Sequence, residues 1–298
     1  MTVYDCFTYD GEECLDLRLR THWEQVDVFV IVEAAITFSG MAKALSFDVE
    51  RYAWALDKIR YIPLSADEFA ACQTAWDRER LQRNALQRGY ADAAPDDLVI
   101  ISDVDEILRP ACLKVPGPGE VLVFEQLMLY FFCDYLQVSE PFWRKAIATR
   151  ADLALRHAPD DLRNDKALRK TLREVLLANA GWHFSYLGGM EMVERKLQRF
   201  SHQNLNKPRY RNSKQNVARL RAGKDIYRRA RRWGRVIMAN EMFESPVVQG
   251  WFAERPALWA PADIRSVSSL NLVMDAYRRQ RASSRPWRKL WLRLWNFF

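Results

Sequence analysis

The stretch Leu98-Val99-Ile100-Ile101-Ser102-Asp103-Val104-Asp105-Glu106-Ile107 carries three carboxylates at the end of an apolar run. A short, β-branched apolar run is typical of a strand buried in a parallel sheet. Strand geometry then places Asp103 and Asp105, two residues apart, on one face. Crowded carboxylates repel one another, and a hard divalent cation is the usual counter-charge. The stretch therefore predicts either a metal that holds a diphosphate or an acidic loop that caps a helix.

The composition is that of a globular protein. The chain has 298 residues, of which 49% are hydrophobic and 28% charged. This length suits one large α/β domain or two small ones. The five cysteines form no Cys-x-x-Cys pair, which favours free thiols in a reducing compartment. Since neither a secretory signal nor a transmembrane stretch stands out, we expect a cytoplasmic protein.

Strand-like and helix-like segments alternate along the first half of the chain. Residues 26–33 are short, apolar and rich in β-branched side chains, and a second strand is expected at residues 58–64. A helix is expected from Ser65 to about Gly89. Further strands are expected at residues 121–125, 127–135 and 182–187, and a helix at residues 191–200. Such alternation predicts a mostly parallel central sheet with helices on both faces. The acidic stretch then leaves the carboxyl end of that sheet, where α/β proteins bind ligands.

Four separated stretches follow the pattern of one family. They are Phe29-Val30-Ile31-Val32-Glu33 with Thr37-Phe38-Ser39-Gly40; Trp76-Asp77-Arg78-Glu79-Arg80-Leu81-Gln82-Arg83-Asn84; Ser102-Asp103-Val104-Asp105-Glu106-Ile107; and Gly181-Trp182-His183-Phe184-Ser185-Tyr186-Leu187-Gly188-Gly189. In that order they resemble glycosyltransferase family 17, whose named members are β-1,4-mannosyl-glycoprotein 4-β-N-acetylglucosaminyltransferases. The resemblance implies a GT-A-like nucleotide-sugar transferase fold. We expect a catalytic domain over residues 1–240 and a C-terminal extension over residues 241–298.

The resemblance also implies a metal-dependent, inverting transfer. The donor would be UDP-GlcNAc, with Mn²⁺ or Mg²⁺ against its diphosphate, and the acceptor a glycan or a lipid-linked saccharide. Negative charge develops on the departing diphosphate, and the cation would stabilise it in place. Asp105 is expected to ligate the metal directly and Asp103 to ligate it or to lie nearer the ribose, while His202 resembles a third ligand.

Five further residues are expected at the donor site. Glu33 and Ser39 follow the strand at residues 26–33, where the resemblance places the uridine and its ribose. Arg80, Arg83 and Asn84 are three and four residues apart, so they share one helix face. If that face looks toward the acidic stretch, both arginines bind diphosphate oxygens and Asn84 binds the nucleotide. The alternatives are a solvated strand end for Glu33 and surface charges for the arginines.

An inverting transfer needs a general base, because a sugar hydroxyl is a weak nucleophile. Glu191 follows two glycines at the start of a helix, and the resemblance assigns it that role, with Asp134 and Glu125 as reserves. A carboxylate that only stabilises a helix N-terminus is the alternative for Glu191. His183 is expected to line the donor or acceptor pocket.

The net charge of +7 is unevenly distributed. Residues 207–235 contain twelve basic residues and one acidic residue, whereas residues 1–206 are acidic overall. The basic segment closes over UDP, contacts anionic lipid or faces only solvent, and the sequence leaves these alternatives open. We expect no nucleic-acid partner, since no recognition motif accompanies the charge.

The last residues form an aromatic stripe at helical spacing. The stripe comprises Trp287, Leu290, Trp291, Leu294, Trp295 and Phe298. Such a stripe opposite basic residues predicts either an interfacial helix on an anionic membrane or a helix packed on the core. A peripheral enzyme of the inner membrane face that builds a bacterial surface polysaccharide fits the first alternative.

Two other functions compete with the transferase. One is a non-enzymatic membrane- or polyanion-binding protein built around the basic segment. The other is a metal-dependent phosphatase of the haloacid-dehalogenase-like type. Its Asp-x-Asp-x-Thr motif is incomplete here, because Ile107 stands at the threonine position.

Overall fold

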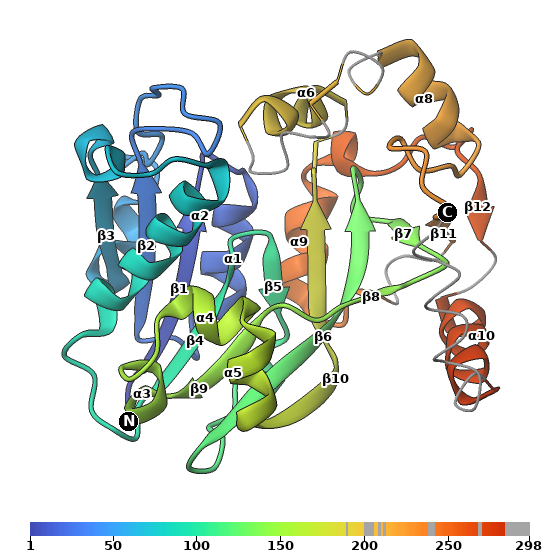
Figure 1. Ribbon diagram of the computed structural model, residues 1–298. Coiled ribbons are helices and arrows are strands. Elements are labelled where there is room, and N and C mark those ends of the chain that lie inside the picture. The colour runs from blue at the N-terminus through green and yellow to red at the C-terminus, as the bar shows by residue number, and fades with distance from the viewer. Residues whose placement is uncertain are drawn as a thin grey trace. The chain divides into compact units, whose positions relative to one another are not determined.

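The computed structural model describes residues 1–188, 190–199, 206–207, 210, 213–237, 242–267 and 270–283 (Figure 1). The chain divides into two compact units. Unit 1 comprises Met1–Leu127, Trp143–Phe184 and Arg195–Asn206, and unit 2 comprises Met128–Phe142, Ser185–Glu194 and Lys207–Phe298. The expected domain boundary after residue 240 stays a prediction.

Unit 1 is built on four parallel strands. In spatial order they are β3 (Ile59–Leu64), β2 (Val28–Ala34), β1 (Val3–Tyr9) and β4 (Leu98–Asp103). β4 then pairs antiparallel with β9 (Ile147–Arg150), and β9 pairs antiparallel with β6 (Glu120–Tyr130). The expected mixed α/β class with a parallel sheet between helices is confirmed. Only the strands beyond β4 depart from the parallel arrangement.

Helices cover both faces of the parallel strands, as the alternation of side chains along β1 shows. Asp5 points toward α1 (Cys14–His22), where it bonds Arg18. Tyr4 and Cys6 instead belong to the apolar core under the 3₁₀ helix η3 (Ala85–Tyr90), which continues α2 (Ala75–Asn84). Buried side chains on both faces are what a parallel strand requires.

The single helix expected from Ser65 to Gly89 is wrong. Ser65 and Glu68 form a capping box, but it starts only the short 3₁₀ helix η2 (Ala66–Phe69). A second capping box, Thr74 with Asp77, then starts α2. Each box satisfies backbone donors at a helix start, so the second one begins a new helix.

The strands also differ from those expected. The strand β1 has no counterpart among the expected strands. Residues 121–125 and 127–135, expected as two strands, largely form the single strand β6, and β7 (Tyr135–Gln137) follows. The strand at residues 182–187 is the end of β10 (Arg173–Ser185). The expected helix at 191–200 is confirmed as α6 (Met190–Arg199).

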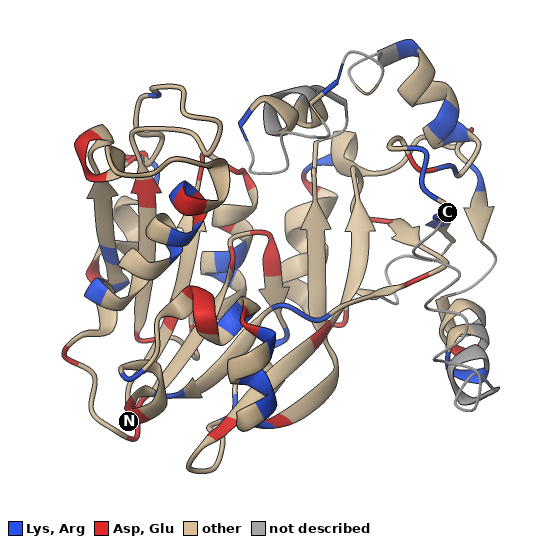
Figure 2. Ribbon diagram, in the orientation of Figure 1, with Lys and Arg blue, Asp and Glu red and all other residues tan. Residues whose placement is uncertain are grey.

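Shorter elements connect these parts within unit 1. They are η1 (Ala53–Lys58), β5 (Glu106–Leu108), η4 (Pro110–Cys112), α3 (Ala151–Ala154), α4 (Pro159–Asn164) and α5 (Lys166–Thr171). β8 (Phe142–Trp143) pairs with β6. In Figure 2 both α2 and α4 carry acidic and basic bands.

Unit 2 contains the end of β6, β7 and the basic segment at residues 207–235. Its other elements are α8 (Ser213–Arg221), β11 (Trp233–Val236), α9 (Pro246–Ala253), η7 (Pro256–Leu258), β12 (Ser266–Val267) and α10 (Leu270–Ser283). Figure 2 shows basic bands on α8 and on the segment after it. Arg221 pairs with Asp263 at 2.9 Å and Arg229 with Asp225 at 2.8 Å, so part of this charge is neutralised internally. Among the described helices, none is long and apolar enough to cross a membrane. The aromatic stripe at residues 287–298 lies outside the described residues.

Candidate active site

The acidic stretch forms a turn and not a continuous strand. β4 ends at Asp103, residues Val104 and Asp105 turn, and β5 begins at Glu106. The expectation that Asp103 and Asp105 share one strand face is therefore wrong, because alternation stops where the strand ends. Their side chains differ in exposure, at 32% for Asp103 and 7% for Asp105.

Two arginines from different helices hold the Asp103 carboxylate. Arg83 of α2 donates to Oδ1 at 3.2 Å, and Arg163 of α4 donates to Oδ2 at 2.6 Å. Burial by itself would raise the pKa of Asp103, but the two guanidinium groups outweigh it and hold that pKa below its ordinary value. Asp103 is thus an ionised carboxylate already paired within the protein.

Glu106 lies at the end of the turn opposite Asp103, and its carboxylate accepts several hydrogen bonds. Its side chain is fully buried and accepts hydrogen bonds from Arg163 at 2.7 and 2.8 Å and from the Trp143 indole at 2.5 Å. It also accepts from the backbone N–H of Asp103 at 3.0 Å. The alternative of an acidic loop that caps a helix is therefore wrong, since the stretch continues into the strand β5 at Glu106.

A third arginine reaches the turn from the opposite face of the sheet. Arg18 of α1 donates to the backbone carbonyls of Asp103 at 2.8 Å and Glu106 at 3.0 Å. It is held by the buried carboxylate of Asp5 at 2.5 Å and by the Ser102 hydroxyl at 2.5 Å. Burial by itself would raise the pKa of Asp5, but Arg18 and a hydrogen bond from His22 hold it well below its ordinary value.

His183 lies beside Asp105 because β10 pairs with β5. His183 is the register partner of Glu106, and its Nε2 lies 3.4 Å from Asp105 Oδ1. Two positions earlier, Gly181 has φ +149°, and a Cβ there would lie 2.1 Å from the Ile107 carbonyl oxygen. The close approach of the two strands therefore requires glycine.

The donor set at this turn suits a hard cation, though it is incomplete. Carboxylate oxygens are the ligands that Mg²⁺ and Mn²⁺ prefer, and Mg²⁺ commonly takes only one or two carboxylates together with substrate phosphates and water. Within the described ranges, no group of three or more His, Cys, Asp or Glu side chains could hold a metal. His202, the expected third ligand, lies outside those ranges. Asp105 with Asp103 fits the role of a partial ligand set.

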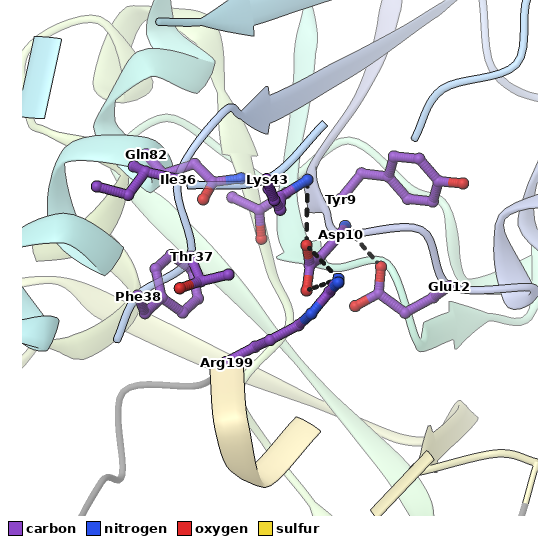
Figure 3. A pocket seen from close by; sticks show the side chains of 10 residues that line it. Tyr9, Asp10, Glu12, Ile36, Thr37, Phe38, Lys43, Gln82 and Arg199 are labelled. Atoms are coloured by element: carbon purple, nitrogen blue, oxygen red, sulfur yellow. Dashed lines mark hydrogen bonds and ion pairs between the residues drawn. The ribbon is translucent and has the colours of Figure 1, made fainter. Parts of the chain in front are cut away.

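A pocket opens beside the turn at the carboxyl ends of β1 and β2. It is lined by Thr8, Tyr9, Asp10, Glu12, Ile36, Thr37, Phe38, Lys43, Gln82 and Arg199. Figure 3 shows Lys43 and Arg199 approaching the Asp10 carboxylate from two sides, at 3.1 and 3.4 Å. Phe38 and Ile36 supply apolar surface next to these charges.

Comparison with known protein families gives a match over most of this chain. The family model described as glycosyltransferase family 17 matches residues 1–230. The chain belongs to glycosyltransferase family 17. No curated relative matches it. Five solved chains match, among them the galactosyltransferase LgtC in complex with donor and acceptor sugar analogs, with 14% identity and a TM-score of 0.30. That match covers 57% of this chain and 65% of the LgtC chain, which is less than two thirds of its length.

In this member of glycosyltransferase family 17, Glu33 is neither solvated nor part of the pocket lining. It is fully buried and accepts hydrogen bonds from Lys43 at 2.6 Å, the Ser46 N–H at 2.6 Å and the Tyr61 hydroxyl at 3.0 Å. The solvated strand end is therefore excluded, and Glu33 holds the loop that carries Lys43. Its contact with uridine or ribose stays a prediction.

Ser39 lies in the loop that forms one wall of the pocket. Its hydroxyl bonds that of Thr37 at 2.8 Å, and its backbone N–H donates to the carbonyl of Arg199 at 3.2 Å. The loop is closed by a bond from the Met41 N–H to the Thr37 hydroxyl at 3.0 Å. Ser39 thus connects two walls of the pocket.

Of Arg80, Arg83 and Asn84, only Arg83 reaches the acidic turn in the described contacts, and the other two contact Asp160 of α4. The Arg83 side chain is buried and bonds Asp103. The Arg80 side chain is largely exposed, and its Nε lies 3.6 Å from Asp160 Oδ2. Asn84 accepts the backbone N–H of Asp160 at 3.0 Å, so it anchors α4 to α2. Their contacts with diphosphate and nucleotide stay predictions.

The candidate bases fall in different surroundings. Glu191 lies in the first turn of α6, and its side chain is outside the described part of the structure. Asp134 is buried, accepts the Ala260 N–H at 2.8 Å, and burial raises its pKa to about 6. Glu125 is buried and bonds Arg144.

Sequence reasoning missed several residues of this region. Asp10 and Glu12 could have been found, because Asp-Gly-Glu directly follows the β-forming run Val3–Tyr9. Lys43 and Arg199 carry no motif, and Arg163 lies sixty positions beyond the carboxylate that it holds. Only the packing of distant elements reveals them.

Proposed function

We propose that this chain is a metal-dependent, inverting glycosyltransferase that moves N-acetylglucosamine from UDP-GlcNAc to a glycan or a lipid-linked saccharide. Membership of glycosyltransferase family 17 supports the transferase class. The donor sugar and the acceptor follow from the resemblance alone. The cation and the nucleotide site are supported by the geometry of unit 1.

One observation carries the proposal: the pocket and the acidic turn adjoin on neighbouring strands. Thr8 lines the pocket and is the register partner of Asp103 across β1 and β4. The chain leaves β1 toward β2 on one side, and β4 lies on the other. Parallel sheets bind ligands outside their carboxyl ends at such a change of direction. A nucleotide whose nucleoside part occupied the pocket would have its phosphates within reach of the turn.

The pocket combines groups that suit a nucleoside. The Phe38 ring offers a flat apolar surface to a base, and the Asp10 carboxylate can accept hydrogen bonds from ribose hydroxyls. Lys43 and Arg199 supply positive charge on either side of Asp10. Together these groups offer a nucleoside an apolar surface, hydrogen-bond acceptors and charged hydrogen-bond donors.

At the turn, Asp105 and Asp103 would hold Mn²⁺ or Mg²⁺. When bound, the cation would neutralise the negative charge of the departing diphosphate. The chain's own residues prepare that position, because Arg18, Arg83 and Arg163 hold the turn and Asp103 in place. We assign the general base to Glu191, which would take the proton from the acceptor hydroxyl as the new bond forms on the opposite face of the sugar.

Calorimetry with UDP, in the presence and absence of Mn²⁺, tests the proposal. The wild-type chain should bind UDP more tightly with Mn²⁺, and Asp105→Asn should abolish that gain, whereas Asp96→Asn, at an exposed surface position, should keep it. Screening nucleotide sugars for hydrolysis then identifies the donor. Absence of UDP binding in the wild-type chain, with or without Mn²⁺, would contradict the assignment.

A further inference from the structure

We propose that Arg163 is a positioning residue of the donor site, which fixes the turn from Asp103 to Glu106 before a cation or nucleotide arrives. This inference rests on the proposed function and extends it to a residue that no motif marks. Arg163 comes from α4, and its side chain is almost fully buried, at 3% exposure.

The contacts of Arg163 join the two ends of the turn. Its Nη2 donates to Asp103 Oδ2 at 2.6 Å and to Glu106 Oε1 at 2.7 Å, and its Nη1 donates to Glu106 Oε2 at 2.8 Å. A guanidinium group is a rigid planar fork, so it sets the separation and orientation of both carboxylates. Val104 and Asp105 lie between these two anchored points, which limits where Asp105 can be.

The other two arginines make different contacts. Arg83 bonds Asp103 only at Oδ1, and it also donates to Asp160 at 2.6 Å and to Glu79 at 2.9 Å. Arg18 contacts backbone carbonyls of the turn and no carboxylate in it. Among the described residues, Arg163 is the arginine that bonds the side chains of both Asp103 and Glu106.

The two aspartates of the turn have different partners within the protein. Both oxygens of Asp103 accept from guanidinium groups, so the repulsion at the strand end is relieved by the protein itself. Asp105 lies instead beside the imidazole of His183. A cation would then meet Asp105 in a position that Arg163 has already set, as partners behind a metal ligand commonly do.

Hydrogen exchange and UDP titration on the full chain test this inference. The variants are Arg163→Gln and the charge-conserving Arg163→Lys, with Arg156→Gln as control because Arg156 is exposed and makes an ion pair with Asp152. Without ligand, amides of residues 103–108 should exchange faster in Arg163→Gln while those of β1 and β2 are unchanged. The gain in UDP affinity on adding Mn²⁺ should fall about 10- to 100-fold, with UDP affinity in the absence of Mn²⁺ preserved. Arg163→Lys should restore part of that gain.

The results of hydrogen exchange and UDP titration together support or overturn the inference. Unchanged exchange at residues 103–108 in both variants overturns the inference. Faster exchange with the Mn²⁺ gain intact also overturns it, because Arg163 would then support only the fold. If Arg163→Gln does not fold, Arg163→Lys carries the same two measurements. If the wild-type chain shows no Mn²⁺-dependent UDP binding, the metal-dependent part of the proposed function fails and no donor-site role is left for Arg163; exchange then reports only whether Arg163 holds the turn.

Discussion

The ammonium nitrogen of Lys43 lies 2.6 Å from the fully buried carboxylate of Glu33. The same nitrogen lies 3.1 Å from Asp10, which is on the wall of the pocket. Glu33, expected to contact the nucleotide, therefore positions Lys43, which lines the pocket. Both members of the Glu33–Lys43 pair are buried, so neither charge is screened well by water.

We expect Lys43→Met to destabilise the protein by about 3–5 kcal/mol, because it leaves Glu33 buried without its cation. Urea unfolding measures this free energy. Arg88→Met removes an exposed arginine paired with Glu68 and should cost less than about 1 kcal/mol. Equal losses in the two variants would show that the Glu33 pair contributes no more than a surface pair.

Arg199→Gln should weaken UDP binding in the absence of metal by about tenfold or more, because a charged hydrogen-bond donor is lost from the pocket. Isothermal titration calorimetry measures the change. Arg88→Gln serves as the matched control. An unchanged affinity in Arg199→Gln would place the phosphates and ribose away from this arginine.

Asp134 should make stability depend on pH. Burial raises its pKa to about 6, so the folded state favours the neutral carboxyl group. The contribution of Asp134 to the free energy of unfolding is therefore fully present below the unfolded-state pKa. It is lost as the pH rises through about 6, by about 3 kcal/mol in total. Urea unfolding at about pH 4 and about pH 7.5 should show this loss in the wild-type chain relative to Asp134→Asn. Parallel pH dependences in the two proteins would count against a raised pKa.

Glu191→Gln should retain UDP binding while transfer falls by about 10²- to 10⁴-fold, since the amide cannot accept the acceptor's proton. The rate of sugar transfer and the UDP affinity are measured on the same preparation. Glu254→Gln, at an exposed position, is the control and should leave both unchanged. Turnover at the wild-type rate in Glu191→Gln would move the base elsewhere, with Asp134 and Glu125 next to test.

Local pattern was sufficient for much of the sheet and for the place of the site. The runs that became β2 and β4 are apolar and rich in β-branched residues, the run that became β3 was also expected as a strand, and the acidic turn does follow β4 at the carboxyl edge. β1 was missed because Asp5 interrupts its apolar pattern. That carboxylate is buried only because Arg18 and His22 of α1 meet it.

Residue pattern alone was enough to predict the α/β class, the resemblance to glycosyltransferase family 17 and the crowded carboxylates after a buried strand. The partners of these carboxylates, in contrast, depend on how the helices pack around the turn. Arg83 and Arg163 bond carboxylates of the turn, whereas Arg18 bonds its backbone carbonyls. These arginines lie on three separate helices, and no spacing rule connects positions so far apart in the chain. Strand and helix periods act over a few residues, whereas ion pairs depend on how whole elements pack.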